Sequence, residues 1–400
     1  MSVQELAIKE SVTVSQQPSR LVRDRFERTR LKLRVFHQIF GIILHKTGKP
    51  LAALRMVWEM MRKFQTIFGE PMPTKVAKVG KRYFWHLGVA GFPSEASLRV
   101  HGNEVSRFIS GQQPTGLRSL LFAITKKCPM NCEHCFEWDN LNQQEELSTA
   151  NLVQIVLKYQ EYGTSQIMFS GGEPMLRVND ICEVLKTAQS GTDFWIISSG
   201  LGLNLERAHR LKKVGLTGVM ISLDHFEANK HNEFRGFENA YDSAIQAVIN
   251  ANQAGLVTTL SLCATKDFTT AENLAAYMNL AKSLGVSFVQ ILEPRASGRY
   301  KGKEVELGKE EILLLEKTYI EYNTTPAYVD FPIVNYLGYH QRRVGCFGAG
   351  NRFFYIDTDG DAHVCPFCTN KVANTLQFSA EDMVNLVGQH ACHAFDKSDF

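Results

Sequence analysis

Three cysteines, Cys128, Cys132 and Cys135, follow one another with three and then two residues between them. Thiolates at this spacing can bind three irons of a cubane iron–sulfur cluster while leaving the fourth iron open to an external chelator. A structural metal site would normally close its shell with a fourth protein ligand. The spacing therefore predicts a redox site, and the alternative is a zinc site completed by His134 or by a distant residue.

A second motif follows the cysteines by about three dozen residues. The sequence Ser-Gly-Gly-Glu-Pro, residues 170–174, comes directly after an apolar, β-rich run at residues 165–169. Two glycines let the chain turn sharply at the end of a strand. Such a turn exposes backbone groups and one carboxylate, Glu173, which together could hold the ammonium group of an amino-acid cofactor.

The two motifs together resemble those of the radical S-adenosylmethionine (SAM) superfamily, over roughly residues 117–295. The resemblance implies a [4Fe-4S] cluster on Cys128, Cys132 and Cys135, with SAM bound to the open iron through its amino and carboxylate groups. One-electron reduction would cleave SAM and release a 5'-deoxyadenosyl radical that abstracts a substrate hydrogen. His134 departs from the pattern, because many members carry an aromatic residue before the third cysteine.

The resemblance also implies a set of residues around SAM. The glycine-rich motif matches the segment that contacts the SAM amino group, and two serines stand where members often bind the ribose or the carboxylate. Arg235 could pair with the SAM carboxylate through its planar guanidinium, although Asp224 and Arg235 could equally form an ordinary loop ion pair. The predicted cofactor-binding residues are Gly171, Gly172, Glu173, Ser198, Ser199, Asp224 and Arg235.

Strands and helices alternate from residue 119 onward, which predicts parallel βα units. The expected strands cover residues 120–125, 167–169, 194–198, 218–223, 258–263 and 288–292, and the expected helices cover residues 148–162, 179–188, 204–214, 239–254 and 271–284. The predicted fold class is α/β, a partial (β/α)6 TIM-like barrel with an N-terminal helical region and a small C-terminal cysteine-rich α+β domain.

Functional groups of parallel barrels gather at the carboxyl ends of the strands. Three polar side chains expected there are candidates for the catalytic role: Asp224, Cys263 and Glu293. Cys263 could also be a buried strand cysteine, and Cys182 is expected to pack on a helix.

The tail carries Cys346, Gly360, Cys365, Cys368 and, near the end, Cys392. Residues 353–369 predict a hairpin that turns at Asp359-Gly360 and brings Cys365 into place. The spacing is similar to the auxiliary-cluster tails called SPASM or twitch domains, although full SPASM tails need about seven cysteines. This similarity implies one auxiliary [4Fe-4S] cluster, with zinc as the alternative. With Cys392 as fourth ligand the cluster would conduct electrons, and without it the open iron could bind substrate.

The chain has 400 residues, which allows more than one domain. We expect a basic helical region at 1–113, the radical SAM barrel at 114–325 and the auxiliary-cluster domain at 326–400. Residues 1–113 hold 19 Lys and Arg against 8 Asp and Glu, a net charge of +11 in a chain of net charge +3. Helical patterns cover residues 20–44 and 51–68, and the second has one apolar stripe of Leu54, Val57, Trp58, Met61, Phe64 and Ile67.

The basic region has three interpretations: a solvated face that covers the catalytic domain, a peripheral contact with an anionic membrane, or a site for an acidic peptide or protein. Nucleic acid is not expected, because no base-stacking aromatic array accompanies the charge.

The sequence shows no signal peptide pattern and no span of membrane length, and its cysteines fall in metal-like clusters. We therefore expect a cytoplasmic protein, with the inner membrane face as a peripheral site.

Three functions follow from these patterns. The first is a radical SAM enzyme that oxidises or cross-links a peptide or protein side chain, with the auxiliary cluster aiding net oxidation. The second is the same chemistry on a small molecule, a sugar or lipid precursor. The third is a non-enzymatic iron–sulfur or zinc scaffold. For either enzyme, a protein such as flavodoxin or ferredoxin is the expected reductant.

Overall fold

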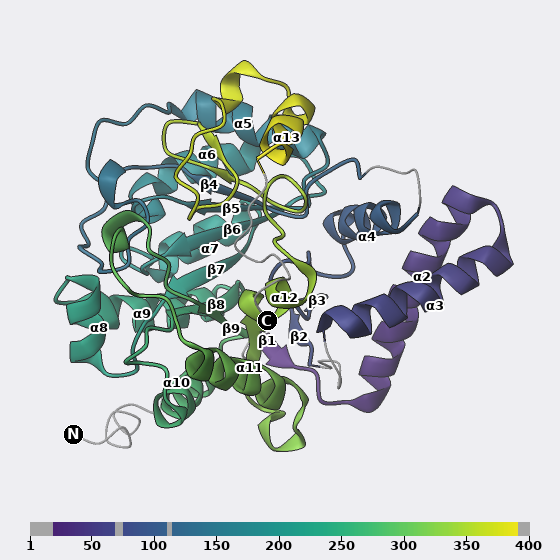
Figure 1. The fold of residues 1–400 in the computed structure, drawn as a ribbon, viewed down its shortest axis with the longest axis horizontal. Helices are drawn as coiled ribbons and strands as arrows, with labels where there is room; N and C mark the ends of the chain where they lie inside the picture. Colours follow the sequence, from purple (N-terminus) through teal and green to yellow (C-terminus); the bar gives the residue numbers. More distant parts are fainter. Residues whose placement is uncertain (1–18, 69–74, 110–113, 391–400) are drawn as a thin grey trace.

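The computed structural model describes residues 19–68, 75–109 and 114–390 of the chain. Its centre is a nine-stranded sheet in the order β10-β9-β8-β7-β6-β5-β4-β11-β12 (Figure 1). The six central strands run parallel and lie where the sequence predicts them, within about two residues at either end. They are β4 (Leu120–Ala123), β5 (Gln166–Ser170), β6 (Asp193–Ser198), β7 (Leu216–Ser222), β8 (Val257–Cys263) and β9 (Phe288–Leu292).

A helix follows each of these strands and returns the chain to the start of the next one. Ser148 caps the first of these helices, because its side chain accepts a hydrogen bond from the Asn151 backbone N–H. The helices are α5 (Thr149–Glu161), α6 (Val178–Thr187), α7 (Leu205–Lys213), α9 (Ala240–Gln253), α10 (Ala271–Ser283) and α11 (Lys309–Thr324). Helix α11 and the short helix α8 (Ala228–Arg235), which lies between β7 and α9, are outside the predicted ranges.

The two faces of the sheet have different neighbours, because successive side chains of a strand point to opposite sides. Ile196, Val219 and Leu260 join the main core with the helices. Trp195 and Met220, one position away along the same strands, pack instead against Ala77, Val79 and Phe84 of a small N-terminal sheet. This sheet consists of β1 (Ser19–Leu21), β2 (Ala77–Val79) and β3 (Arg82–Phe84).

The tail continues the barrel sheet at both edges. Strand β10 (Ile333–Tyr336) pairs in parallel with β9, and helix α12 (Leu337–Val344) follows it directly. At the other edge β11 (Tyr355–Ile356) pairs in parallel with β4, placing Tyr355 opposite Leu121. Strand β12 (Ala362–His363) closes the predicted hairpin on β11, and helix α13 (Ala380–Gly388) ends the described chain. The domain boundary at residue 325 stays a prediction.

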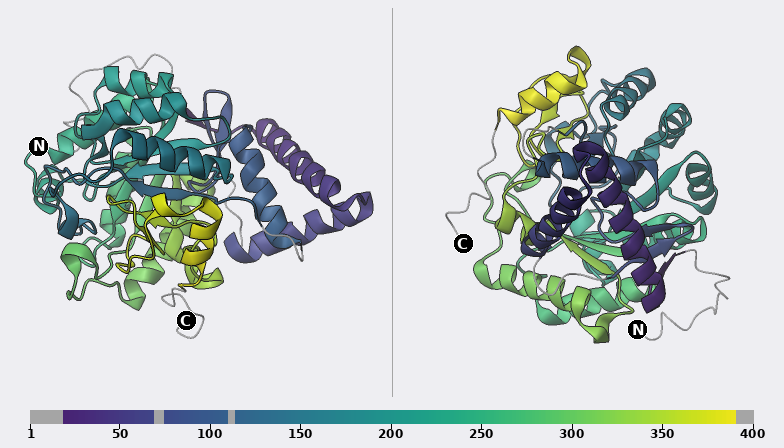
Figure 2. Two further views of the ribbon diagram at one scale, coloured as in Figure 1. Left: turned by 90° about the horizontal axis from the view of Figure 1, so that it is seen from above. Right: turned by 90° about the vertical axis from the view of Figure 1, so that its right-hand side faces the viewer.

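Two long helices, α2 (Arg25–Thr47) and α3 (Pro50–Phe68), stand beside the barrel as a hairpin and confirm the predicted helical region (Figure 2). Asp24 caps the start of α2, and Gly48, at φ 66°, ends it in the left-handed conformation that glycine adopts readily. Helix α4 (Glu95–Phe108) packs on the hairpin through Val105. None of the described helices is long and apolar enough to cross a bilayer.

Candidate active site

The three cysteines of the first motif lie on the loop that leaves β4. Cys128, Cys132 and Cys135 share an apolar cluster with Met130 and Ala240. Asn142 fixes the start of this loop, because its side chain accepts from the Cys128 backbone N–H and donates to the Cys128 carbonyl, each at 3.0 Å. The structure thus brings the three thiols into one cluster on the loop after β4, and their role as cluster ligands stays a prediction.

The donor set consists of three free thiols, the ligand type that binds iron–sulfur clusters. Burial raises the pKa of the Cys128 thiol to about 11 and that of Cys135 to about 12, so the bare thiols are protonated and metal binding would release protons. Among the described residues, no three His, Cys, Asp or Glu side chains stand close enough to hold a metal ion together.

The Gly-Gly-Glu turn packs against the cysteine loop. Gly172 N–H donates to the Thr125 carbonyl at 2.7 Å, and Glu173 N–H donates to the Lys127 carbonyl at 2.8 Å. A Cβ at Gly172 would meet the Lys127 carbonyl oxygen at 2.3 Å and the Cys128 Cβ at 3.1 Å. Glycine is required here because the two backbones approach too closely for any side chain.

Glu173 is buried, and donors of the chain itself occupy its carboxylate. Oε1 accepts from the Met175 N–H at 2.9 Å and from the Ser198 hydroxyl at 2.8 Å. Oε2 accepts from the Ser199 N–H at 2.9 Å and also from the Ser199 hydroxyl. Burial raises the pKa of Glu173, whereas these four donors favour the charged form. The structure therefore brings Glu173, Ser198 and Ser199 together, and the carboxylate links the turn to the end of β6; their contact with SAM stays a prediction.

Asp224 and Arg235 form a buried ion pair beside the second cysteine. Arg235 Nε and Nη2 lie 2.6 and 2.5 Å from Asp224 Oδ2, and Arg235 Nη1 lies 3.7 Å from Cys132 Sγ. Burial alone would raise the pKa of Asp224, but the Arg235 guanidinium outweighs it and holds that pKa below its usual range. The guanidinium thus faces a carboxylate and a thiol, and its predicted pairing with the SAM carboxylate stays a prediction.

The three catalytic candidates differ in their surroundings. Cys263 is buried at the end of β8, where its N–H donates to Asp224 Oδ1 at 3.0 Å. Asp224 and Cys263 therefore belong to one group beside the cysteine loop. Glu293 instead accepts from the Tyr336 hydroxyl at 2.6 Å and from Arg342 Nη1 at 2.7 Å, so it ties the end of β9 to α12. Cys182 lies buried on α6, in the main core.

His134, the departure from the family pattern, occupies an aromatic position. Its ring stacks on Phe234 with centroids 4.9 Å apart, and its Nδ1 is buried without a hydrogen-bond partner. A histidine is thus accommodated where many family members carry an aromatic side chain.

The cysteines of the tail gather at the end of the β11–β12 hairpin. Cys365 Sγ and Cys368 Sγ lie 3.3 Å apart, and the Ala349 N–H donates to the Val364 carbonyl, which brings the loop after Cys346 alongside them. The hydrogen bond with Cys368 lowers the pKa of Cys365. Cys392 lies outside the described residues.

Aromatic side chains connect the two cysteine sites. Phe136, which follows Cys135, contacts Phe367, which lies between Cys365 and Cys368, with ring centroids 6.2 Å apart and an edge-on geometry. Phe136 also contacts Tyr355 of β11, whose hydroxyl donates to the buried Glu137.

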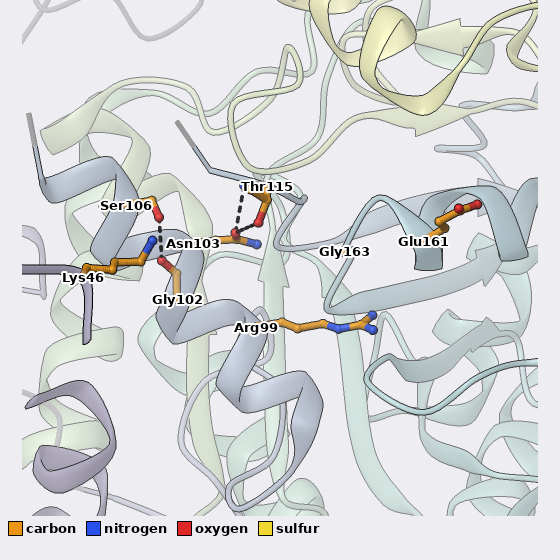
Figure 3. A pocket seen from close by; sticks show the side chains of 8 residues that line it. All are labelled: Lys46, Arg99, Gly102, Asn103, Ser106, Thr115, Glu161 and Gly163. Atoms are coloured by element: carbon orange, nitrogen blue, oxygen red, sulfur yellow. Dashed lines mark hydrogen bonds between the residues drawn. The ribbon is translucent and has the colours of Figure 1, made fainter. Parts of the chain in front are cut away.

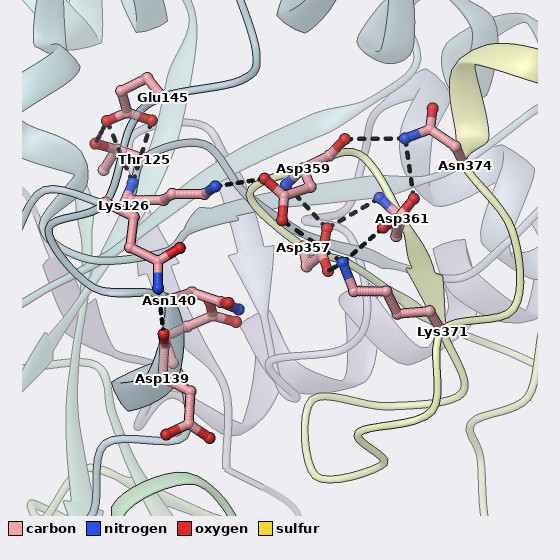
Figure 4. A network of polar contacts seen from close by, with 12 residues as sticks. Thr125, Lys126, Asp139, Asn140, Glu145, Asp357, Asp359, Asp361, Lys371 and Asn374 are labelled. Atoms are coloured by element: carbon pink, nitrogen blue, oxygen red, sulfur yellow. Dashed lines mark hydrogen bonds and ion pairs between the residues drawn. The ribbon is translucent and has the colours of Figure 1, made fainter.

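A polar network links the same two segments (Figure 4). Lys126 of the cysteine loop is buried, and its Nζ lies 2.5 Å from Asp359 Oδ1 at the tip of the hairpin. Lys371 lies 2.7 Å from Asp361 Oδ2 and 3.5 Å from Asp359 Oδ2. The acidic tip is therefore neutralised by lysines from both sides, which holds the tail against the cysteine loop.

Sequence reasoning missed several residues that position these groups. Arg299 donates through Nη1 to the Asn131 side chain and to the Cys132 carbonyl, each at 3.2 Å, and His231 Nδ1 accepts from the Asp224 N–H at 3.0 Å. Arg299 and His231 follow no motif, so no sequence signal would have found them. Asn142 has φ 59°, a conformation that asparagine tolerates better than most residues, but it lies in a segment without other signals.

A cavity of about 340 Å³ lies away from these residues (Figure 3). Its lining comes from the end of α2, from α4 and from the loops near residues 115 and 163: Lys46, Arg99, Gly102, Asn103, Ser106, Thr115, Glu161 and Gly163. None of them is a candidate site residue.

Comparison with known proteins gives the same family as the two motifs of the site. Residues 122–281 match the family model of the Radical SAM superfamily. A PqqA peptide cyclase of Methylocella silvestris is 29% identical over 180 residues, covering 45% of this chain and 48% of that protein. A Fe-coproporphyrin III synthase of Methanosarcina barkeri is 31% identical over 139 residues, covering 34% of each chain. The chain thus spans about a third to a half of the length of these curated relatives.

Solved structures share the fold at low identity. SuiB of Streptococcus suis, bound to its precursor peptide SuiA, aligns with a TM-score of 0.56 at 13% identity, covering 74% of this chain and 72% of that one. The enzyme anSMEcpe, with bound AdoMet and the Kp18Cys peptide, aligns with a TM-score of 0.55 at 15% identity, covering 70% and 84%. The family match, the parallel barrel and the thiol loop packed on its Gly-Gly-Glu turn together identify this chain as one that carries a radical SAM domain.

Proposed function

We propose that this protein is a radical SAM enzyme that cleaves SAM reductively to a 5'-deoxyadenosyl radical, abstracts a hydrogen from a peptide or protein side chain, and uses an auxiliary [4Fe-4S] cluster to aid net oxidation. The observation that carries the proposal is the packing of the cysteine loop, which holds three clustered thiols, against the Gly171–Gly172 turn. A structural metal site would need no such turn beside it.

In this proposal Cys128, Cys132 and Cys135 hold the first cluster. When bound, that cluster supplies the electron that cleaves SAM. Glu173 already accepts four hydrogen bonds, so we assign it to holding the turn in place and assign the backbone oxygens of the turn to the SAM ammonium. The hydroxyls of Ser198 and Ser199 donate to Glu173, so we assign these two serines to holding the turn in place as well.

The Asp224–Arg235 pair keeps a positive charge next to Cys132. A guanidinium beside a cluster ligand offsets part of the negative charge that the thiolate ligands bring to the site. Asp224 in turn keeps Arg235 in place and accepts from the backbone of Cys263. We therefore assign the pair to preparing the second cysteine for the cluster rather than to the reacting bond.

For the tail we propose a second [4Fe-4S] cluster on Cys346, Cys365 and Cys368, with Cys392 as the fourth ligand and zinc as the alternative. The contact between Phe136 and Phe367 supports this placement, because each ring adjoins a ligand of one site. Protein between two such sites excludes water from the space where a substrate radical would lose its second electron.

The peptide substrate is supported by the relatives whose names or titles include a peptide, namely the PqqA peptide cyclase, SuiB with SuiA, and anSMEcpe with Kp18Cys. The similarity to Fe-coproporphyrin III synthase, a name that specifies a product other than a peptide, favours the small-molecule alternative. The scaffold alternative has the least support, because a scaffold would require neither an open iron nor the glycine turn. We also propose a flavodoxin or ferredoxin as reductant and the cytoplasm as the location.

The experiment that tests this function is anaerobic reconstitution, iron and sulfide analysis, then reduction with dithionite in the presence of SAM and an assay for 5'-deoxyadenosine. We expect about eight irons per chain, for two four-iron clusters, and deoxyadenosine formation. Cys132→Ala should abolish SAM cleavage, whereas Cys365→Ala should retain some cleavage and lose product. Cys182→Ala is the matched control, since this cysteine is buried in the core away from both sites and should leave the iron content unchanged.

Three other results would change the proposal. About four irons with deoxyadenosine would keep the radical enzyme and assign zinc to the tail. Zinc alone without SAM cleavage would leave the scaffold. Full turnover by Cys132→Ala would refute the assignment. To separate the substrate classes, the genes beside this chain are searched for a short cysteine-containing peptide. A peptide found there is incubated with the reconstituted enzyme, and its modification is followed by mass spectrometry.

A further inference from the structure

The outer face of helix α3 carries large apolar side chains that nothing in the described structure covers. Leu51, Leu54, Trp58 and Met61 are 83%, 48%, 58% and 57% exposed. Their spacing of three, four and three residues puts them on one side of the helix. We call these four residues the α3 stripe.

The α3 stripe is separate from the face that α3 uses for folding. Ala53, Val57 and Met60 are buried against Ile43 of α2 and Val105 of α4. The hairpin therefore already has a core, and the α3 stripe is a second apolar surface. Isolated exposed apolar residues are common, but a contiguous row of this kind marks an interaction site.

The charge around the α3 stripe is strongly positive. Residues 25–68 hold ten Lys and Arg against two Asp and Glu. On α3 itself Arg55, Arg62 and Lys63 are exposed, and the Arg62 guanidinium lies 4.7 Å above the Trp58 ring. Basic side chains thus flank the apolar row on the same helix.

We propose that the α2–α3 hairpin docks on an anionic lipid bilayer, with the α3 stripe inserted at the level of the headgroups. An apolar row flanked by Lys and Arg is the pattern of helices that lie in the plane of a membrane interface, and tryptophan prefers that level. A second copy of this chain is a poorer partner, because it would bring the same positive charge to the contact. The hairpin stands at one side of the barrel, so a bilayer can reach it (Figure 2).

The test is flotation of the full-length, anaerobically reconstituted protein with vesicles of equal parts phosphatidylglycerol and phosphatidylcholine, and with vesicles of phosphatidylcholine alone. We expect binding to the first and little to the second, and we expect added salt to weaken it because salt screens the attraction. Brominated acyl chains should quench Trp58 fluorescence in the wild type, and the quenching should be lost in Trp58→Phe.

Leu54→Ser with Met61→Ser removes apolar side chains that are already exposed, so the variant should fold normally by circular dichroism. Its affinity for the anionic vesicles should fall by at least about tenfold. Leu313→Ser on α11 is the matched control, since Leu313 is 55% exposed and lies outside the hairpin, and it should bind like the wild type.

Several results would overturn the inference. Equal vesicle binding by the stripe variant and the wild type would show that the stripe does not insert. Binding of an acidic peptide such as poly-glutamate, without binding to anionic vesicles, would assign the surface to a protein partner. A dimer in sedimentation experiments that disappears in the stripe variant, again without vesicle binding, would make the stripe a self-association surface.

Discussion

Replacement of Asp224 by asparagine removes one partner of a buried ion pair and keeps the shape of the side chain. In the wild type, two nitrogens of Arg235 lie 2.6 and 2.5 Å from a carboxylate oxygen of Asp224. In the variant they would face a neutral amide, and the guanidinium would have no counter-charge there. Both side chains are nearly inaccessible, at 3% for Asp224 and 9% for Arg235. Water therefore cannot replace the lost charge.

Breaking a buried pair from one side costs about 3–5 kcal/mol in other proteins, because the remaining charge is uncompensated. We expect Asp224→Asn to lose about that much free energy of unfolding in the metal-free protein. The double variant Asp224→Asn, Arg235→Met should recover part of the loss, since it also removes the stranded charge. Glu227→Gln, which breaks an exposed pair with Lys230, is the control and should change stability by less than about 1 kcal/mol.

The assay is urea unfolding followed by tryptophan fluorescence, repeated at several pH values. Arg235 holds the pKa of Asp224 below its usual range in spite of burial. The contribution of the pair is therefore fully present above the unfolded aspartate pKa of about 3.9 and is lost as the pH falls through the folded value. The difference between wild type and variant should shrink in acid. A difference below about 1 kcal/mol at neutral pH, or one that grows in acid, would refute this reasoning.

Three further predictions follow from particular contacts. Gly172→Ala should displace the cysteine loop and lower iron uptake, because its Cβ would meet the Lys127 carbonyl oxygen at 2.3 Å. Gly41→Ala, whose Cβ would have nothing within 4 Å, should reconstitute normally. Equal iron content in the two variants would contradict the close approach at Gly172. Burial lowers the pKa of Lys75 to about 7, so between pH 7 and 10.5 the native state binds fewer protons than the unfolded state and gains stability as the pH rises. Urea unfolding of Lys75→Met should lack this gain. The same pH dependence of stability in wild type and variant would count against this prediction. Lys126→Met should lower the free energy of unfolding by about 1–3 kcal/mol and speed hydrogen exchange at residues 355–363, because the buried ammonium holds Asp359 of the hairpin. Unchanged exchange there would mean that the β11–β4 pairing alone holds the tail.

The strands of the barrel could be predicted because each is a short apolar, β-rich run bounded by turn residues. Strands β8 and β9 lie almost where the pattern puts them, and Ser148, Asn204 and Thr270 begin helices as capping residues should. These signals are local, so the sequence contains them in full. The convergence of the first three thiols follows from their spacing in the same way.

Contacts between distant segments could not be predicted. Glu293 has the sequence position of a catalytic residue, but its carboxylate accepts hydrogen bonds from Tyr336 of β10 and Arg342 of α12. No sequence pattern predicts that this helix lies near β9. The α3 helix was predicted with a single apolar stripe; the structure divides it, because α2 covers Val57 and leaves Leu54 and Trp58 exposed. The side chains of Phe64 and Ile67, which the same pattern included, are not among those described.

The pairing of β11 with β4 has a consequence for how the protein is made. Tyr355 lies opposite Leu121, so the strand that leads into the first cysteine loop gains its outer neighbour only after nearly all of the described chain has been synthesised. Contacts of such long sequence separation form late, because a large loop must close first. In the cell, the first cysteine loop would therefore leave the ribosome long before its final neighbours, and iron delivered too early would meet thiols that are still accessible to solvent and to oxidants.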